Sequence, residues 1–375
     1  MSADARPSRI HPANDSGLTF GTAEMALDPG LAAVGDGMWW SLTAHAGKVR
    51  HYTTESAFRH GWNAFHEVLG DRMTSVLHRM AVAVVLPEGL AARRADDTLG
   101  YLRAAAFTPV LARPVSLGPA PFREMWRYQS TAHSYDAMVL NELAGGKTPS
   151  MMLVLRDDDP SPDQPASVRL ASLKGPATPA KRHPGHLRSV LGAPNPTLVM
   201  VHCSDEPIDV VRELAIVVDY GDLADLVRRI GSAMSGDTAE EGDTAEEAAA
   251  CLRDGENRVA AHDMDVSSAV KAVRRRIDEA RVVPADRDVA DRAEAALLGA
   301  LGGAALGWRR WSRDLTALGI DTMSWDVLVV ASTYIDHKLA GAIRVIDGKR
   351  TAAWRPVIDP NGERRFSARP AAGPC

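Results

Sequence analysis

The order of apolar segments between residues 80 and 218 constrains the fold more than any other feature of the sequence. The first segment runs from Met80 to Leu86 and is stopped by Pro87-Glu88-Gly89, and the last runs from Thr197 into His202. Short apolar and β-branched runs ended by turn residues are typical of buried strands. Helix-like segments with capping residues lie between these runs, so the region predicts a unit of mixed helix and sheet.

Turn signals and side-chain periodicity divide this region into strands and helices. We expect strands at 80–86, 108–115, 151–155 and 197–202, and helices at 96–106, 121–128, 134–144, 168–173 and 205–218. The resulting order is β-α-β-(αα)-β-α-β-α. It favours the α+β class and, within that class, a ferredoxin-like antiparallel α/β sandwich.

The regions on either side of this unit predict further layers. At the N-terminus we expect a start without fixed structure, short strands at 38–42 and 49–52, and a helix from Thr54 to about Met73. After residue 220, an acidic tandem from Gly236 to Glu247 has the composition of a flexible linker. We then expect helices at 266–281, 286–302, 307–317 and 324–345, with Asp265 and Ser324 as caps, and an extended tail. The predicted domains are 1–77, 78–220, the linker 221–255, the helical region 256–350 and the tail 351–375.

Composition and charge exclude several classes of function. The formal net charge is -5 and the pI is near 6.2, which argues against a general nucleic-acid binder. The cysteines Cys203, Cys251 and Cys375 form neither a disulfide framework nor a metal-ligand pattern, so a reducing cytoplasm is expected. No apolar run approaches the length that crosses a bilayer, so no membrane partner is expected.

The strand that ends at His202 carries the main candidate for chemistry. Val201-His202-Cys203-Ser204-Asp205 leads from a strand to a helix N-terminus, and Pro184-Gly185-His186-Leu187-Arg188 is a second turn that ends in an arginine. A histidine in this position can accept a phosphoryl group, because helix N-terminal amides and an arginine stabilise phosphate charge. The alternatives are a core histidine at residue 202 and, for Glu213, an exposed helix carboxylate.

Three motifs, taken in order, resemble the nucleoside diphosphate kinase family over roughly residues 78–220. Val84-Val85-Leu86-Pro87-Glu88-Gly89 resembles the family's first strand and its Lys-Pro-Asp turn. The segment from Leu173 to Pro179, followed by Pro184 to Arg188, resembles the nucleotide loop that ends in Pro-Gly-Thr-Ile-Arg. His202-Cys203-Ser204-Asp205, followed by Val211-Arg212-Glu213-Leu214, resembles the His-Gly-Ser-Asp signature with its Arg-Glu-Ile helix.

The resemblance implies roles for four residues. His202 matches the histidine that the family phosphorylates, Glu213 the carboxylate that orients it, and Ser204 a hydroxyl close to it. Arg188 matches an arginine that neutralises phosphate charge during transfer. The resemblance also implies ATP or another nucleotide with Mg²⁺, a small anionic acceptor and a homo-oligomer.

The sequence departs from the family pattern at several nucleotide contacts. The family's first-strand lysine is Leu86, its asparagine before the histidine is Val199, and its phosphate-loop threonine is Ala177, with Thr178 next to it. Lys174, Lys181 and Arg182 add positive charge to the same loop, and Arg169 lies near the position of a family arginine. These cations offer other phosphate contacts, although solvated loop charge is the commoner role for each one singly.

Three functions stay open on these grounds. The first is a diverged phosphotransferase of the nucleoside diphosphate kinase type in a specialised bacterial biosynthetic pathway. The second is a nucleotide-binding pseudokinase whose helical region binds a partner, and the third is an enzyme that uses the same pocket for another reaction on a phosphorylated or nucleoside substrate. Leu86 and Val199 count against ordinary kinase activity, whereas retention of the histidine, its two partners and Arg188 counts against an inactive pocket.

Overall fold

The computed structural model describes residue 31 and residues 34–161, 163–235, 241–346, 353–358 and 364–368. A four-stranded antiparallel sheet with the strand order β2-β3-β1-β4 lies at its centre. The strands are β1 (Met80–Val85), β2 (Phe107–Val115), β3 (Ser150–Asp157) and β4 (Val201–Cys203). Together with the helices around this sheet, they confirm the α+β class.

Both faces of the sheet are buried. Successive residues of β1 alternate between two apolar clusters, with Ala83 and Val85 in one and Val82 and Val84 in the other, as the two-residue period of a strand requires. The first cluster includes residues of α6 (Pro87–Ala91), α7 (Ala95–Ala104), α9 (Tyr135–Gly145), α10 (Ala166–Lys174) and α11 (Leu187–Val190). The second includes residues of α4 (Ser56–Leu69), α5 (Met73–Arg79), α8 (Pro119–Met125), α12 (Pro207–Val217) and α13 (Leu223–Ser235).

The predicted strands at 38–42 and 49–52 are wrong, because both segments are helical. They form α2 (Asp36–Leu42) and α3 (Ala46–Tyr52), and a third helix, α4, begins two residues after Thr54. Trp39, Trp40 and Leu42 are buried on α2, so their aromatic and apolar side chains serve tertiary packing. Packing of this kind overrides local strand preference. The expected start without fixed structure lies outside the described residues.

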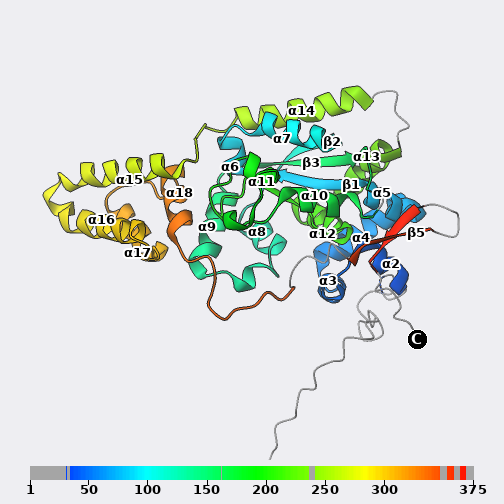
Figure 1. Ribbon diagram of the computed structural model, residues 1–375, viewed down its shortest axis with the longest axis horizontal. Coiled ribbons are helices and arrows are strands. Elements are labelled where there is room, and N and C mark those ends of the chain that lie inside the picture. The colour runs from blue at the N-terminus through cyan, green and yellow to red at the C-terminus, as the bar shows by residue number, and fades with distance from the viewer. Residues whose placement is uncertain are drawn as a thin grey trace, which may run out of the picture.

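The predicted flexible linker at 221–255 is also wrong wherever the structure describes it. α13 packs on α4, and α14 (Glu241–Asn257) packs along β2, as Figure 1 shows at the top of the molecule. Gly255 lets α14 approach the sheet, since a Cβ there would lie 2.4 Å from Met151 Sδ. Glu246 and Glu247 of the acidic tandem are exposed on this helix, which covers the edge strand β2, a common protection for such an edge.

The C-terminal helices form a lobe at one end of the sheet (Figure 1). Three are close to their predicted bounds, as α15 (Val266–Arg281), α16 (Arg287–Leu301) and α17 (Trp308–Ala317), with Asp265 capping α15 by accepting from Ser268 N at 2.7 Å. The fourth, α18 (Trp325–Tyr334), ends eleven residues before the predicted residue 345. Ser324 occupies its N-cap position but makes no side-chain capping bond.

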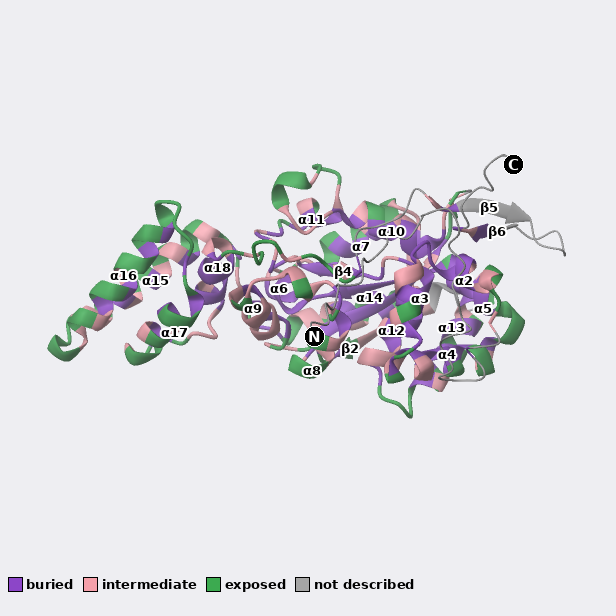
Figure 2. Cartoon of the chain, turned by 90° about the horizontal axis from the view of Figure 1, so that it is seen from below, coloured by how far each residue is buried: buried purple, intermediate pink, exposed green. Residues whose placement is uncertain are grey.

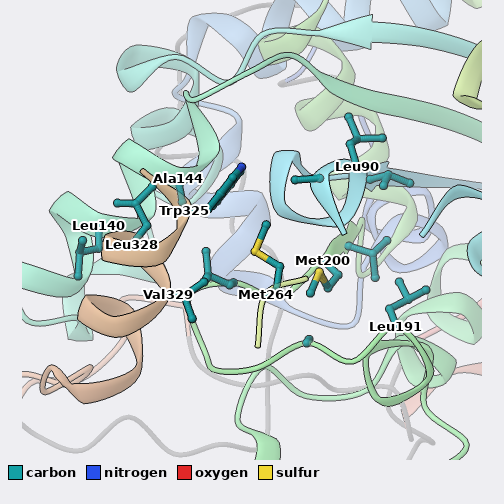
Figure 3. Close-up of a cluster of buried hydrophobic side chains, with 14 of the residues drawn as sticks. Leu90, Leu140, Ala144, Leu191, Met200, Met264, Trp325, Leu328 and Val329 are labelled. Carbon is teal, nitrogen blue, oxygen red and sulfur yellow. The ribbon is translucent and has the colours of Figure 1, made fainter. Parts of the chain in front are cut away.

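The lobe shares its core with the sheet. Trp325, Leu328 and Val329 of α18 lie against Leu140 and Ala144 of α9 (Figure 3), within one continuous apolar cluster. Buried residues accordingly run from the sheet into the lobe in Figure 2. The helical region is therefore packed on the α/β unit.

The described part of the tail differs from the predicted extended arm. β5 (Arg355–Ile358) and β6 (Arg364–Ser367) pair as an antiparallel hairpin, and Ala368 N donates to Trp40 O at 2.8 Å. Within the described ranges, no helix has the length and apolarity needed to cross a membrane.

Candidate functional site

His202 lies in β4, an edge strand that pairs with β1. It stands opposite Val84, so its side chain lies on the sheet face that α12 covers. After Cys203 the chain turns and enters α12, where Glu206 at the N-cap and Asp209 three residues later form a capping box. Because α12 begins so soon after β4, its second turn lies beside the end of that strand.

The side chains of His202, Ser204 and Glu213 meet there and are named the site cluster below. Nε2 of His202 lies 3.0 Å from Oε2 of Glu213, and Ser204 Oγ donates to the same oxygen at 2.6 Å. Burial alone would raise the pKa of Glu213, but the His202 charge and the two hydrogen bonds outweigh burial and lower that pKa. An ionised Glu213 holds the proton of a neutral imidazole on Nε2, which leaves Nδ1 with its lone pair.

The remaining nitrogen of His202 is available for chemistry. Among the described residues, no side chain or backbone group hydrogen-bonds to Nδ1. The imidazole is 12% exposed, so a ligand can reach it, while its partner Glu213 stays oriented. A nucleophilic or basic nitrogen with an orienting carboxylate behind it is the arrangement that covalent and acid–base catalysis use.

Trp126, which follows α8, forms the wall of the site cluster. Its ring lies edge-on to the His202 imidazole, with 5.2 Å between centroids and 79° between planes, and it packs on Phe122. This contact could not be predicted from the sequence, because an aromatic residue at a helix end is most often part of the core. The site therefore has an aromatic side that sequence reasoning missed.

The guanidinium of Arg188 is buried against the backbone of β4, the strand that carries His202. It donates to Val201 O at 3.0 and 3.2 Å and to Gly175 O at 3.1 Å, and within the described residues it makes no ion pair. Burial lowers the pKa of Arg188, against the opposing charges of Cys203, Asp205 and Glu88. A buried guanidinium with N–H groups to spare and no carboxylate partner is suited to an anion.

The other predicted cations of the loop are held by the protein itself. Lys174 donates to Cys203 O at 2.7 Å and pairs with Asp205 at 3.1 Å. Arg182 donates to the carbonyl oxygens of Pro176 and Ala193 at 2.9 and 2.6 Å, and burial lowers its pKa to about 10. These two side chains fix the loop around Arg188.

Three predicted contacts lie outside this arrangement or at its margin. Lys181 is exposed on a 3-10 turn, Pro179–Lys181, that begins after a half-buried Thr178. Arg169 pairs with Asp157 and covers the Phe107 ring. Asp157 lies at the opposite end of β3 from Met152, the residue aligned with Val84 and His202, so Arg169 is not part of the site.

A buried carboxyl group that the sequence did not single out supports the turn before β4. Glu88 is 2% exposed and accepts from Met200 N at 3.1 Å, and Met200 has a positive φ of 65°. Burial raises the pKa of Glu88 to about 7, against the opposing charge of Arg188. Leu86, at the position of the family lysine, is 5% exposed and its N donates to Met200 O at 2.9 Å.

The described residues offer no dedicated metal site, because no three His, Cys, Asp or Glu side chains converge within them as ligands. Magnesium commonly reaches such sites bound to substrate phosphates, and Arg188 with its spare donors fits the phosphate part of that pair. The comparisons with known proteins add no identity: no protein-family model matches the chain, and no curated protein matches it.

Proposed function

We propose that the chain is a diverged phosphotransferase of the nucleoside diphosphate kinase type, with His202 as the phosphoryl acceptor. The observation that carries the proposal is the site cluster, in which Glu213 bonds Nε2 of His202, Ser204 donates to the same Glu213 oxygen, and Nδ1 has no hydrogen-bond partner among the described residues. The strand order β2-β3-β1-β4, antiparallel throughout, supports the ferredoxin-like arrangement that the proposal requires.

The chemistry takes place in two balanced steps. The Nδ1 lone pair attacks the terminal phosphorus of a nucleoside triphosphate, an N–P bond forms, and the P–O bond to the leaving diphosphate breaks. The phosphoryl group then passes from Nδ1 to an oxygen of the acceptor. Glu213 stabilises the positive charge that develops on the ring, and the proposal assigns the anionic phosphate oxygens to Arg188, whose guanidinium is anchored to Val201 O in the same strand as His202.

Labelling with γ-³²P-ATP and Mg²⁺ tests the proposal. We expect an acid-labile, base-stable label on the wild type that disappears in His202→Ala. His183→Ala is the matched control, because His183 is an exposed histidine of the neighbouring loop and its variant should keep the label. A wild type that takes up no label contradicts the phosphohistidine mechanism.

One observation favours a second candidate, an enzyme of another reaction class or a nucleotide-binding module built on the same pocket. Lys174, Arg182 and Arg188 all donate to backbone carbonyl oxygens, so less positive charge faces a nucleotide than the sequence predicts. Leu86→Lys, assayed for phosphorylation of GDP, separates the candidates. Activity that appears only in this variant would favour a pocket that has lost its original reaction.

A further inference from the structure

A second charged cluster lies one turn before the site cluster on the same helix. Glu206 and Asp209, at the start of α12, receive the ammonium of Lys48 from α3, with 2.8 Å between Nζ and Glu206 Oε2. Lys48 is 7% exposed although it comes from a segment more than 150 residues away in sequence. The cluster of Lys48, Glu206 and Asp209 is named the clamp below.

Every carboxylate oxygen of the clamp accepts at least one hydrogen bond. Glu206 accepts from Thr43 Oγ1 at 2.6 Å, from Ala44 N at 2.8 Å and from Trp354 Nε1 at 3.3 Å, in addition to Lys48. Asp209 accepts from Tyr52 OH at 2.9 Å. Segments from both ends of the chain thus fix the first turn of α12.

The clamp and the site cluster are one helical turn apart. Asp209 and Glu213 are four residues apart, so they lie on the same side of α12. A shift or rotation of the first turn therefore moves the carboxylate that His202 requires. Burial alone would lower the pKa of Lys48, but the charges of Asp209 and Glu206 outweigh burial and raise it well above its ordinary value, so the ammonium stays charged.

We propose that Lys48 is a positioning residue for the His202–Glu213 pair: by fixing Glu206 and Asp209 it sets where Glu213 presents its carboxylate to Nε2. This inference rests on the proposed function for its catalytic meaning, but the geometry that it describes can be measured without any turnover. It also gives the N-terminal helices a role in the site.

The main test uses the full-length Lys48→Met/Asp209→Asn variant. The double change removes one positive and one negative charge from neighbouring positions, so the long-range field at His202 is nearly conserved and only the position of α12 should change. In ¹⁵N-histidine-labelled protein, the Nε2–H proton of His202 should give a downfield resonance, assigned by its loss in His202→Gln. We expect this proton to exchange with water on the order of tenfold faster in the double variant, because its hydrogen bond to Glu213 weakens.

Two further variants make the test decisive. Arg50→Met removes an exposed cation from the same helix and should leave the resonance unchanged. If circular dichroism finds the double variant unfolded, Tyr52→Phe, which removes one bond to Asp209, should accelerate the exchange to a smaller extent. A folded double variant with wild-type exchange overturns the inference, and so does wild-type exchange in Tyr52→Phe when the double variant does not fold.

The labelling assay separates this inference from the proposed function. If the exchange accelerates and the wild type takes up label, the double variant should take up label on the order of tenfold more slowly, as expected for a lost orienting interaction. If the exchange accelerates but the wild type takes up no label, the positioning role of Lys48 is supported and the proposed phosphotransfer is contradicted.

Discussion

Two charged clusters lie one helical turn apart on α12 and differ in one respect. In the clamp every carboxylate oxygen of Glu206 and Asp209 has a donor, whereas in the site cluster the Nδ1 atom of His202 has none within the described residues. A satisfied buried network holds one conformation, and a network with a free nucleophilic atom can react. The helix therefore joins a part that stabilises to a part that is available for chemistry.

The largest expected effect comes from the contacts of Arg212, which lies between Asp209 and Glu213 in the sequence of α12. Arg212 is 1% exposed and donates to Glu55 at 2.6 Å and to Glu124 O at 2.6 Å. Arg212→Met should lower the free energy of unfolding by about 3–5 kcal/mol, because it leaves the Glu55 carboxylate buried without its cation. Urea unfolding at neutral pH measures the change.

An exposed ion pair provides the control for this prediction. Arg228 pairs with Asp225 on α13, where both side chains are more than 60% exposed. Arg228→Met should change the free energy of unfolding by less than about 0.5 kcal/mol. Equal losses in both variants would contradict the assignment of Arg212 to the stabilising part of the helix.

Next in size is the effect of Glu88, a buried carboxyl group that forms no ion pair with any described residue. Its pKa is raised from 4.5 to about 7, so the folded state keeps a proton that the unfolded state loses between these values. Stability therefore falls as the pH rises through this window, by up to roughly 3 kcal/mol. Glu88→Gln removes the cost of ionising a buried carboxyl group. The variant should therefore have a larger free energy of unfolding than the wild type at pH 8, but not at pH 5.

Urea unfolding of both proteins at the two pH values measures this difference. Glu67→Gln, an exposed carboxylate on α4, should give the same difference from the wild type at both pH values. A Glu88→Gln variant whose advantage does not grow with pH would mean that Glu88 is ionised and compensated, as Glu206 of the clamp is by Lys48.

The order of strands along the chain could be predicted from sequence because apolar runs ended by turn residues mark them, but the fourth strand comprises Val201–Cys203 rather than the predicted 197–202. The site cluster could be predicted because its members lie within one motif, from His202 to Glu213. Trp126 and Lys48 could not, since their contacts with the site and the clamp depend on tertiary packing across more than 70 residues. For Lys174 and Arg182 the charge is visible in the sequence, but the carbonyl oxygens that receive it are not.

The errors at both flanks have a common physical origin. Two tryptophans and a leucine suggest a strand at 38–42, and the acidic tandem suggests a linker at 221–255. In each case one face of a helix packs on the rest of the chain, through Trp39 on α2 and Leu252 on α14. Composition describes which residues a segment contains, and only the tertiary structure decides which face of it is buried.

A packing change between α4 and α12 should have a smaller effect than the loss of Arg212. A Cβ at Gly61 would lie 2.5 Å from Val211 O and 3.0 Å from the Ala215 side chain. Gly61→Ala should therefore destabilise the fold by about 1–3 kcal/mol, although alanine favours a helix interior. Thermal or urea unfolding measures the loss.

Gly100 on α7 provides the matched control, because a Cβ there would meet nothing within 4 Å. Gly100→Ala should stabilise the protein by up to about 1 kcal/mol through helix propensity alone. If both alanine variants gain stability, α4 and α12 are not in close contact at Gly61. The N-terminal segment then stabilises the position of α12 less than the geometry indicates.

The smallest expected effect compares one hydroxyl donor to Glu213 of the site cluster with one to Glu206 of the clamp. Ser204→Ala removes the 2.6 Å bond to Glu213, and Thr43→Val removes the 2.6 Å bond to Glu206. Glu206 keeps three other donors, whereas Glu213 keeps one among the described residues, His202, so the first change should lower the labelling rate by about tenfold or less. The second should cost about 1 kcal/mol of stability and affect labelling less. If Thr43→Val lowers the labelling rate more than Ser204→Ala does, the clamp controls the reactivity of His202 and Ser204 contributes only a packing contact.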